Sequence, residues 1–218
     1  MASVLTRRVV PPCASQASAE KSILRAFLKN PRQTGAIWAS SASLGNALVE
    51  AASVESSETV IELGAGTGVV TERIQSKLRK SSRCVSFELD PELAQTASLR
   101  CPRVEVINAD ACELLSVLHE LEVSQCDTVI SGIPWTNFNI RLQASILDAT
   151  TESMTDDGTF VAFAYVHSAP LPRAKHFIRE LRRRFEEVNI NSVVCSNIPP
   201  AIVYKAQGLK YRQNDTDH

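Results

Sequence analysis

The sequence predicts an α/β fold in which a seven-stranded, mostly parallel sheet has helices on both faces and ends in an antiparallel strand. Short apolar runs rich in Val and Ile alternate with segments of helical periodicity, a pattern typical of parallel strands joined by crossover helices. The first such strand, residues 59–63, leads into three glycines at alternate positions and then into a helical pattern. Near the C-terminus, residues 197–200 form a short Pro-containing link that suits a hairpin, so the strand after it should run antiparallel.

The bulk composition fits one soluble α/β domain. The chain has 218 residues, of which 44% are hydrophobic and 22% are charged, values ordinary for a globular protein with a sizeable core. The formal net charge of −1 excludes attraction of the whole molecule to nucleic acid or anionic lipid, so only local patches can supply it. No apolar run approaches the roughly 20 residues that span a bilayer.

We divide the chain into four segments. Residues 1–19 contain Arg and Ser but no acid and are expected to be disordered, with an organellar targeting segment as the alternative. Residues 20–52 are expected to form N-terminal helices, residues 53–207 the sheet domain and residues 208–218 a disordered tail. The six cysteines form no C-x-x-C pair and have no histidine at ligand spacing, so we expect reduced thiols and no metal site.

The first helical pattern, over residues 19–28, is amphipathic and basic. Its apolar residues fall on one side, and Lys21, Arg25 and Lys29 recur every four residues on the other. Two interpretations remain open from this periodicity alone. The helix can pack its apolar stripe on the sheet domain, or it can lie on anionic lipid with its cations toward the headgroups. Ser40 or Ser41 can cap a second helix that runs to about residue 52.

The glycine-rich segment ELGAGTG follows the first strand and precedes a helix expected over residues 69–78, with Thr67 as its N-cap. Glycine tolerates positive φ and allows the backbone to approach a ligand closely. The spacing is neither the G-x-G-x-x-G dinucleotide fingerprint nor a P-loop, because no Lys follows the glycines. A strand, a glycine turn and a helix N-terminus in this order are typical of a nucleotide site at the carboxyl end of a parallel sheet.

Acidic residues follow the next two strands. The segment 83–90 contains the second strand, which ends in Glu88, and this acid is placed to accept hydrogen bonds from both ribose hydroxyls of a nucleoside. Residues 104–108 form the third strand, after which Asp110 can accept from an adenine amino group beside the backbone of Ala111. Asp110 can also cap a helix over residues 111–122, and one residue can do both.

The remaining elements complete the alternation. Strands are expected over 127–131, 159–165, 186–196 and 202–205, and helices over 91–100, 139–154 and 173–185. Residues 155–158 should form a turn. The helix over 173–185 has six cations and one acid. It can bind the phosphates of lipid headgroups or of RNA, or it can be a surface helix whose cations are simply solvated.

The motifs together resemble the bacterial phospholipid N-methyltransferase family, within the Rossmann-like class I S-adenosylmethionine (AdoMet) methyltransferases. The resemblance covers residues 20–206 and rests on VIELGAGTGVVT, FELDPELA, VINADA and, least generically, NPRQTGAI, SGIP and NIPPAIVY. A weaker resemblance is to the rRNA adenine dimethyltransferases. Those carry Asn-x-Pro-aromatic at strand four, where this chain has Ser131-Gly132-Ile133-Pro134, and a helical C-terminal domain that is missing here.

The resemblance implies roles for particular residues. The AdoMet-binding residues that it implies are Glu62, Gly64, Ala65, Gly66, Gly68, Glu88, Leu89, Asp110, Ala111 and Ser131. The glycine loop would hold the methionine part, Glu88 the ribose and Asp110 the adenine. By position and residue type, the candidates near the methyl acceptor are Trp38, Pro134 and Trp135, with packing as the alternative for Trp38. Tyr165, His167 and Tyr204 are candidates for shaping the amine pocket or accepting a proton, with a structural role as the alternative for each.

The predicted function is therefore AdoMet-dependent N-methylation of a phospholipid amine headgroup of the phosphatidylethanolamine type. The implied location is cytoplasmic and peripheral, at the inner face of the membrane, with the helix over residues 20–29 in contact with lipid. The alternative enzymatic functions are adenine N6-methylation of rRNA, with RNA as the partner, and methylation of a small molecule. A non-catalytic AdoMet-binding protein at a lipid surface is the alternative from another class.

Overall fold

A computed structural model of the protein describes residues 41–210. The predicted basic helix over residues 19–28, Trp38 and the segments 1–19 and 211–218 lie outside the described residues. The strands are β1 (Thr59–Leu63), β2 (Arg83–Glu88), β3 (Glu105–Asn108), β4 (Cys126–Ser131), β5 (Met154–Tyr165), β6 (Phe185–Val194) and β7 (Ala201–Leu209). The α-helices are α3 (Ser41–Ala52), α4 (Val69–Lys77), α5 (Pro91–Arg100), α6 (Leu114–Glu120), α7 (Ile140–Glu152) and α8 (Pro172–Arg184). Short 3-10 turns are η1 (Val54–Ser56), η2 (Ala111–Glu113), η3 (Trp135–Asn137) and η4 (Val166–Ser168).

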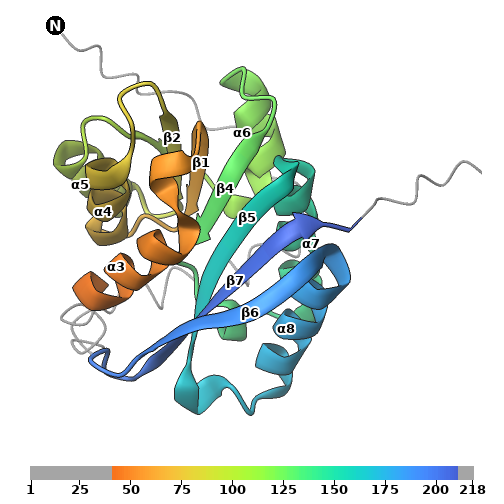
Figure 1. The fold of residues 1–218 in the computed structure, drawn as a ribbon. Coiled ribbons are helices and arrows are strands. Elements are labelled where there is room, and N and C mark those ends of the chain that lie inside the picture. Colours follow the sequence, from red (N-terminus) through yellow and green to blue (C-terminus); the bar gives the residue numbers. More distant parts are fainter. Residues whose placement is uncertain (1–40, 211–218) are drawn as a thin grey trace, which may run out of the picture.

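The strands form one sheet in the order β3-β2-β1-β4-β5-β7-β6 (Figure 1). Strands β1 to β5 pair in parallel, and β7 is antiparallel to both β5 and β6. The predicted fold class is therefore confirmed. The order reverses between β1 and β4, and in open α/β sheets ligands bind outside the carboxyl ends of strands at this reversal.

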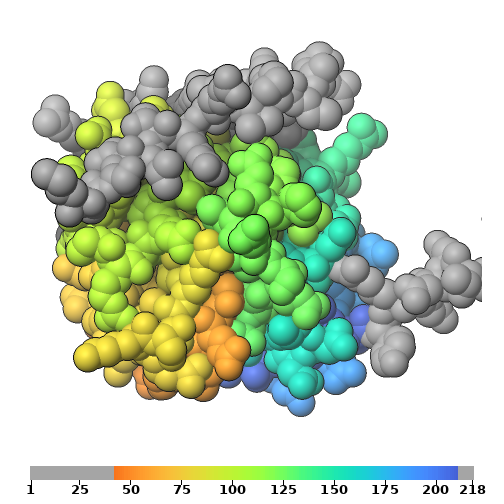
Figure 2. Space-filling model, turned by 90° about the horizontal axis from the view of Figure 1, so that it is seen from above, coloured from red at the N-terminus to blue at the C-terminus, as the bar shows by residue number. Residues whose placement is uncertain are grey.

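Two apolar cores cover the two faces of the sheet. One core joins the sheet to α3 and α4 through residues such as Leu48, Val60 and Ile74. The other joins it to α6, α7 and α8 through residues such as Leu114 and Phe177. The alternation of side chains along a strand explains this division, since neighbours in β1 point to opposite faces. Seen from above, the first half of the described chain occupies one side of the molecule and the C-terminal strands the other (Figure 2).

Local sequence signals account for the helix starts. Pro91 is the first residue of α5, and the Asp90 carboxylate accepts from the backbone N–H groups of Glu92 and Leu93. Asn139 caps α7 in the same way. The expected helix over residues 111–122 is instead the turn η2 followed by α6, which ends at Glu120. The next residue but one, Glu122, has a φ of 56°, which no α-helix accommodates.

Two strands, β5 and β7, are much longer than predicted. The expected turn over residues 155–158 is an irregularity inside β5: Cys126 pairs with Met154, but Thr128 pairs with Thr159. Gly158 lies inside this irregularity, where a Cβ would be 2.8 Å from the Thr155 carbonyl oxygen. At the other end, β7 continues to Leu209, beyond the expected start of a disordered tail, and pairs there with Phe185.

The described cysteines are free thiols, and Cys84, Cys101 and Cys126 are buried. Burial raises the pKa of the Cys126 thiol to about 12, so it packs as a small apolar side chain. Within residues 41–210, no helix is long and apolar enough to cross a membrane.

We expect the Phe177→Ala substitution to lower the free energy of unfolding by about 3–5 kcal/mol, because Phe177 is fully buried and its ring stacks on that of Trp135. Urea unfolding followed by circular dichroism measures this change. The control is Leu99→Ala on α5, where the side chain is 79% exposed and the expected change is below about 0.5 kcal/mol. A loss below about 1 kcal/mol at Phe177 would contradict the packing described.

Candidate functional site

The glycine loop joins β1 to α4 and lies on the end of β2. Gly64, Gly66 and Gly68 have φ values of 86°, 57° and 83°, so each occupies the region that glycine alone enters without strain. The backbone N–H groups of Gly64 and Ala65 donate to the Phe87 carbonyl at 2.8 and 3.0 Å. The N-cap of α4 is Gly68 rather than the predicted Thr67, because the positive φ of Gly68 turns the chain directly into the helix.

The three glycines have different surroundings. A Cβ at Gly68 would be 3.1 Å from the Ala97 Cα in α5, and one at Gly64 would be 2.8 Å from the Ile133 side chain. A Cβ at Gly66 would meet no atom of the described chain within 4 Å. The loop is therefore packed at both ends and open at its centre.

Glu88 at the end of β2 holds the centre of the glycine loop. Its Oε2 accepts from the backbone N–H of Gly66 at 2.8 Å, and its Oε1 accepts from that of Asp90 at 2.9 Å. Burial raises the pKa of Glu88, although these two hydrogen bonds oppose the shift. Each carboxylate oxygen retains a lone pair for a further donor. Leu89 follows half-buried, and its carbonyl accepts from the Asn108 side chain at 3.1 Å.

Asp110 and Ala111 lie just beyond β3, whose end pairs with the end of β2. The Asp110 carboxylate accepts from the Cys112 N–H at 3.0 Å, and the Asp110 N–H donates to Glu113 at 3.2 Å. The Asp110 side chain also accepts from the backbone of Glu113, so Asp110 and Glu113 form a capping box. The predicted capping role of Asp110 is thus present at the start of η2.

Glu62 in β1 is a fully buried carboxyl directly beneath the glycine loop. Its Oε2 accepts from the hydroxyl groups of Thr71 and Ser86, while its Oε1 is buried and has no hydrogen-bond partner among residues 41–210. Burial raises the pKa of Glu62 to about 7, against the opposing effect of the two hydroxyl donors. The sequence gives no signal for Ser86 and Thr71 as partners, because they become neighbours only through the β1–β2 register and the placement of α4.

The loop after β4 touches the glycine loop. The Gly132 N–H donates to the Leu63 carbonyl at 2.8 Å, and a Cβ at Gly132 would lie 2.8 Å from the Gly64 carbonyl oxygen. The loops after β1 and β4 are therefore in backbone contact at the point where the strand order reverses.

Ser131 and Trp135 are buried together behind this contact. The Trp135 indole N–H donates to Ser131 Oγ at 2.9 Å, and the ring stacks on Phe177 at a centroid distance of 4.6 Å. The sequence suggested that Trp135 faces the methyl acceptor. The structure places it elsewhere: Trp135 is only 1% exposed and packs α8 against the sheet. Pro134 is half-buried in the same loop.

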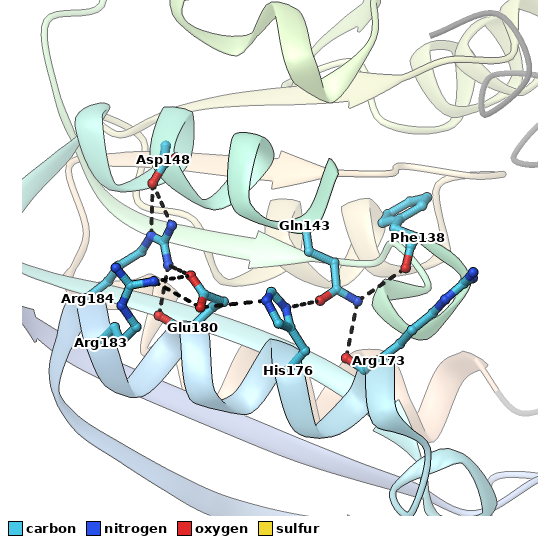
Figure 3. Close-up of polar contacts among 8 residues, drawn as sticks. All are labelled: Phe138, Gln143, Asp148, Arg173, His176, Glu180, Arg183 and Arg184. Carbon is cyan, nitrogen blue, oxygen red and sulfur yellow. Dashed lines mark hydrogen bonds and ion pairs between the residues drawn. The ribbon is translucent and has the colours of Figure 1, made fainter. Parts of the chain in front are cut away.

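A buried polar network fixes the loop after β4 from below (Figure 3). The Gln143 side-chain amide donates to the carbonyls of Trp135, Phe138 and Arg173, at 2.7, 3.4 and 3.2 Å. Its Oε1 must then accept, so His176 Nδ1, at 3.0 Å, carries the proton. This network was not predicted, because a lone Gln in a helix pattern carries no signal for its partners.

The network continues along α8 to Glu180. His176 Nε2 lies 3.7 Å from the Glu180 carboxylate, which also accepts from Arg183 at 3.1 Å and Arg184 at 2.6 Å. Arg184 also pairs with Asp148 of α7 at 2.6 Å. Burial opposes ionisation of Glu180, but the hydrogen bonds from Arg184 and Arg183 outweigh it and lower the pKa.

The three candidate amine-pocket residues are not brought together. The rings of Tyr165 and His167 stack at 5.6 Å beyond the end of β5. Tyr204 pairs with Ala162 across β5 and β7, so it shares the face of Ala162 and points away from Tyr165. Burial raises the pKa of both tyrosines. Tyr165 and His167 therefore lie together, whereas Tyr204 lies on the α8 side of the sheet.

Comparison with known proteins gives relatives of two kinds. The ornithine lipid N-methyltransferase of Singulisphaera acidiphila is 28% identical over 187 residues, which cover 84% of this chain and 93% of that protein. The probable ribosomal RNA small subunit methyltransferase A of Methanosarcina acetivorans is 33% identical over 88 residues, which cover 40% of this chain and 30% of that protein.

Among solved structures, a putative O-methyltransferase from Klebsiella pneumoniae has a TM-score of 0.64 at 16% identity, covering 85% of this chain and 89% of that one. At this identity the likeness concerns the fold. The family model described as ribosomal RNA adenine dimethylase matches residues 28–140, more than half of the sequence. The chain therefore belongs to the ribosomal RNA adenine dimethylase family and is an AdoMet-dependent methyltransferase.

Proposed function

We propose that this methyltransferase methylates the amine headgroup of a membrane lipid, of the phosphatidylethanolamine type. The observation that carries the proposal is the extent of the match. The ornithine lipid N-methyltransferase aligns over nearly its whole length, whereas the archaeal rRNA methyltransferase aligns over less than a third of its own. The part of an rRNA methyltransferase outside the shared domain has no counterpart in that alignment.

The chemistry at the end of β4 supports the same choice. An enzyme that reads a flipped adenine needs a polar group with free donors and acceptors beside the base. Ser131 is fully buried here, and its hydroxyl already accepts from the Trp135 indole. The side chains that follow in the loop, Ile133 and Pro134, are apolar. A loop of this kind suits an amine attached to an aliphatic group.

The residues under the glycine loop fit AdoMet. Glu62 Oε1 is a buried acceptor without a partner among residues 41–210, which suits a cation such as the ammonium of the methionine part. The open centre of the loop at Gly66 leaves room for backbone contact. Glu88 retains acceptor capacity for ribose hydroxyls, with Leu89 beside it, and Asp110 and Ala111 follow at the next strand end for the adenine. Bound AdoMet supplies a methyl group activated by a positively charged sulfur.

The chain itself has to position the amine and remove its proton. Tyr165 and His167 stand together at the end of β5, next in the sheet to the end of β4. We assign Tyr165 to the wall of the amine pocket and His167 to proton acceptance, since a neutral imidazole has one ring nitrogen that can accept a proton. From the sequence, we further propose that Trp38 lies near the methyl acceptor and that a helix over residues 20–29 contacts lipid. The protein would then be located peripherally, on the cytoplasmic face of a membrane.

Methylation of rRNA adenine is the second candidate function. The observation in its favour is the family model, which is named for that activity and matches residues 28–140. The two candidates differ in where the methyl group goes, so one experiment separates them.

We expect Glu88→Ala to weaken AdoMet binding by about 1–3 kcal/mol, because the substitution removes an acceptor and also frees the Gly66 N–H that shapes the loop. Isothermal titration calorimetry measures the change. Glu92→Ala, at an exposed acid of α5, is the control and should bind as the unchanged protein does. Equal affinities for the Glu88 variant and the control would argue against the proposed ribose contact.

We expect AdoMet affinity to rise with pH and to level off above about 7, the pKa to which burial raises Glu62 from 4.5. Below that pH the carboxyl is neutral, and a ligand ammonium has to displace its proton, which costs up to tenfold in affinity per pH unit. The same shift means that Glu62 stabilises the ligand-free fold fully below its ordinary pKa and loses this contribution as the pH rises through about 7.

Calorimetric titrations on both sides of that pKa test this linkage. The Glu62→Gln variant should lose the Glu62-dependent part of the pH response, whereas Glu50→Gln, at an exposed acid of α3, should keep it. An unaltered pH response in the Glu62 variant would exclude Glu62 as the linked group.

Radiolabelled AdoMet incubated with the protein and a cell extract should place label in the lipid fraction, in an amine headgroup. Removal of residues 1–30 should then lower turnover on vesicles far more than AdoMet affinity, because the proposed cofactor contacts lie elsewhere. Label in rRNA would support the second candidate. Unchanged lipid turnover after the truncation would remove the helix over residues 20–29 from the proposal.

A further inference from the structure

A cleft of about 400 Å³ lies between α8 and the C-terminal strands, on the sheet face opposite to α3. Its floor is apolar and includes Ala164 of β5, Phe177 of α8 and the ring of Tyr204 of β7. Three cations of α8, Lys175, Arg179 and Arg182, line it from one side. A cleft with an apolar floor and a cationic rim matches the chemistry of an anionic amphiphile.

These three cations differ from the others on the same helix. Arg183 and Arg184 are neutralised by Glu180, and Arg184 also by Asp148. Arg173 donates to the Asn137 carbonyl at 3.2 Å. The side chains of Lys175, Arg179 and Arg182 are exposed and have no ion pair or hydrogen bond within the described part of the chain. Their spacing of four and three residues places them on one side of α8. The positive charge is therefore available at the cleft.

The apolar surface extends from the floor to the edge strand β6. Ile190 pairs with Tyr204, and Val193 pairs with Ile202, so both share the sheet face of the cleft. In a regular strand, residues three positions apart point to opposite faces. Ile190 and Val193 share a face because the β6–β7 register shifts between Ile190 and Ser192. Ile190 is 60% exposed and Val193 52% exposed. An aliphatic strip thus lies open beside the cationic rim.

We propose that this cleft binds one anionic phospholipid of a bilayer. Its phosphate lies among Lys175, Arg179 and Arg182, and its glycerol and first methylenes lie on Tyr204 and the strip of Ile190 and Val193. The site serves to attach the protein to the membrane and does not depend on which acceptor is methylated. The backbone of RNA would satisfy the cations but has no aliphatic part to cover the strip, which favours lipid.

Two sets of variants test the site in the full chain. Lys175→Gln, Arg179→Gln and Arg182→Gln are combined, and the matched control combines Lys77→Gln, Lys80→Gln and Arg141→Gln, three exposed cations on other surfaces. Each cation near an anionic membrane contributes about 1 kcal/mol, so the cleft triple variant should bind vesicles about 100-fold more weakly. The control triple variant loses the same net charge and should bind within about threefold of the unchanged protein.

The apolar part is tested separately by Ile190→Ser, with Leu99→Ser on α5 as the control for loss of an exposed aliphatic side chain. Co-sedimentation is measured with vesicles of phosphatidylcholine, with and without phosphatidylglycerol, at low and high salt. The Ile190 variant should lose the binding that persists at high salt, while the Leu99 variant keeps it. Circular dichroism and thermal unfolding confirm that each variant is folded.

Several outcomes would overturn the proposal. One is that the cleft and control triple variants differ by no more than the threefold range, and another is that removal of residues 1–30 alone abolishes all vesicle binding. Release of the protein from vesicles by inorganic phosphate, at constant ionic strength, would mean that the cleft binds a free phosphate. Loss of binding to labelled RNA without loss of vesicle binding would assign the cations to nucleic acid. The methyl acceptor is tested separately, by transfer of label to lipid or RNA. Failure of the cleft proposal therefore leaves the proposed function untouched, and the reverse also holds.

Discussion

The close approach of two backbones, at Gly64 and Gly132, is the constraint on which the site depends. Each glycine occupies a position where a Cβ would lie 2.8 Å from an atom of the other loop, and the Gly132 N–H donates to β1 at 2.8 Å. The loop with the cofactor motif and the loop after β4 are thus held together by the main chain. A larger side chain at either position would separate them by forcing the loops apart. The reversal of strand order brings the ends of β1 and β4 side by side, and the two glycines allow the loops that follow them to touch.

The helix α8 supports this contact from the opposite layer. Its Phe177 stacks on Trp135, and the Gln143 amide holds three carbonyls that belong to the loop after β4 and to the start of α8. The buried carboxylate of Glu180 is compensated by Arg184 and Arg183, which is the condition under which a buried charge is tolerated. One side of the helix is therefore committed to the interior, and Lys175, Arg179 and Arg182 are left for the cleft.

The sequence was sufficient for the parts of the fold that depend on local patterns. Strand and helix periodicity predicted the sheet, the short link over residues 197–200 predicted the antiparallel β7, and Pro91 and Asp110 stand at helix starts as expected. Contacts that depend on register or on layer could not be predicted. Tyr165 and Tyr204 are equivalent candidates for the amine pocket in the sequence, but strand pairing places their side chains on opposite faces of the sheet.

The same limit applies to buried partners. A Trp next to Pro looks like a ligand-binding residue in a sequence, and only packing shows that the Trp135 ring is enclosed by Phe138, Phe160 and Phe177. Likewise, Glu62 is an ordinary acid of a glycine motif until its burial gives it an unpartnered oxygen within the described chain. The polar residues that matter most at this site are those whose neighbours come from distant segments.

The register shift in β6 has a consequence for self-association. Within residues 41–210, β6 is the last strand of the sheet and one of its edges pairs with no other strand. Such an edge can pair with a second chain, a hazard that grows when the edge is long, flat and apolar. Ile190 and Val193 make this edge apolar, but the additional residue, Asn191, interrupts the ladder and increases the local twist. The charged pair Glu186 and Glu187 at the start of the strand adds repulsion between identical edges. The irregularity that exposes two aliphatic side chains thus also opposes the growth of the sheet into an aggregate.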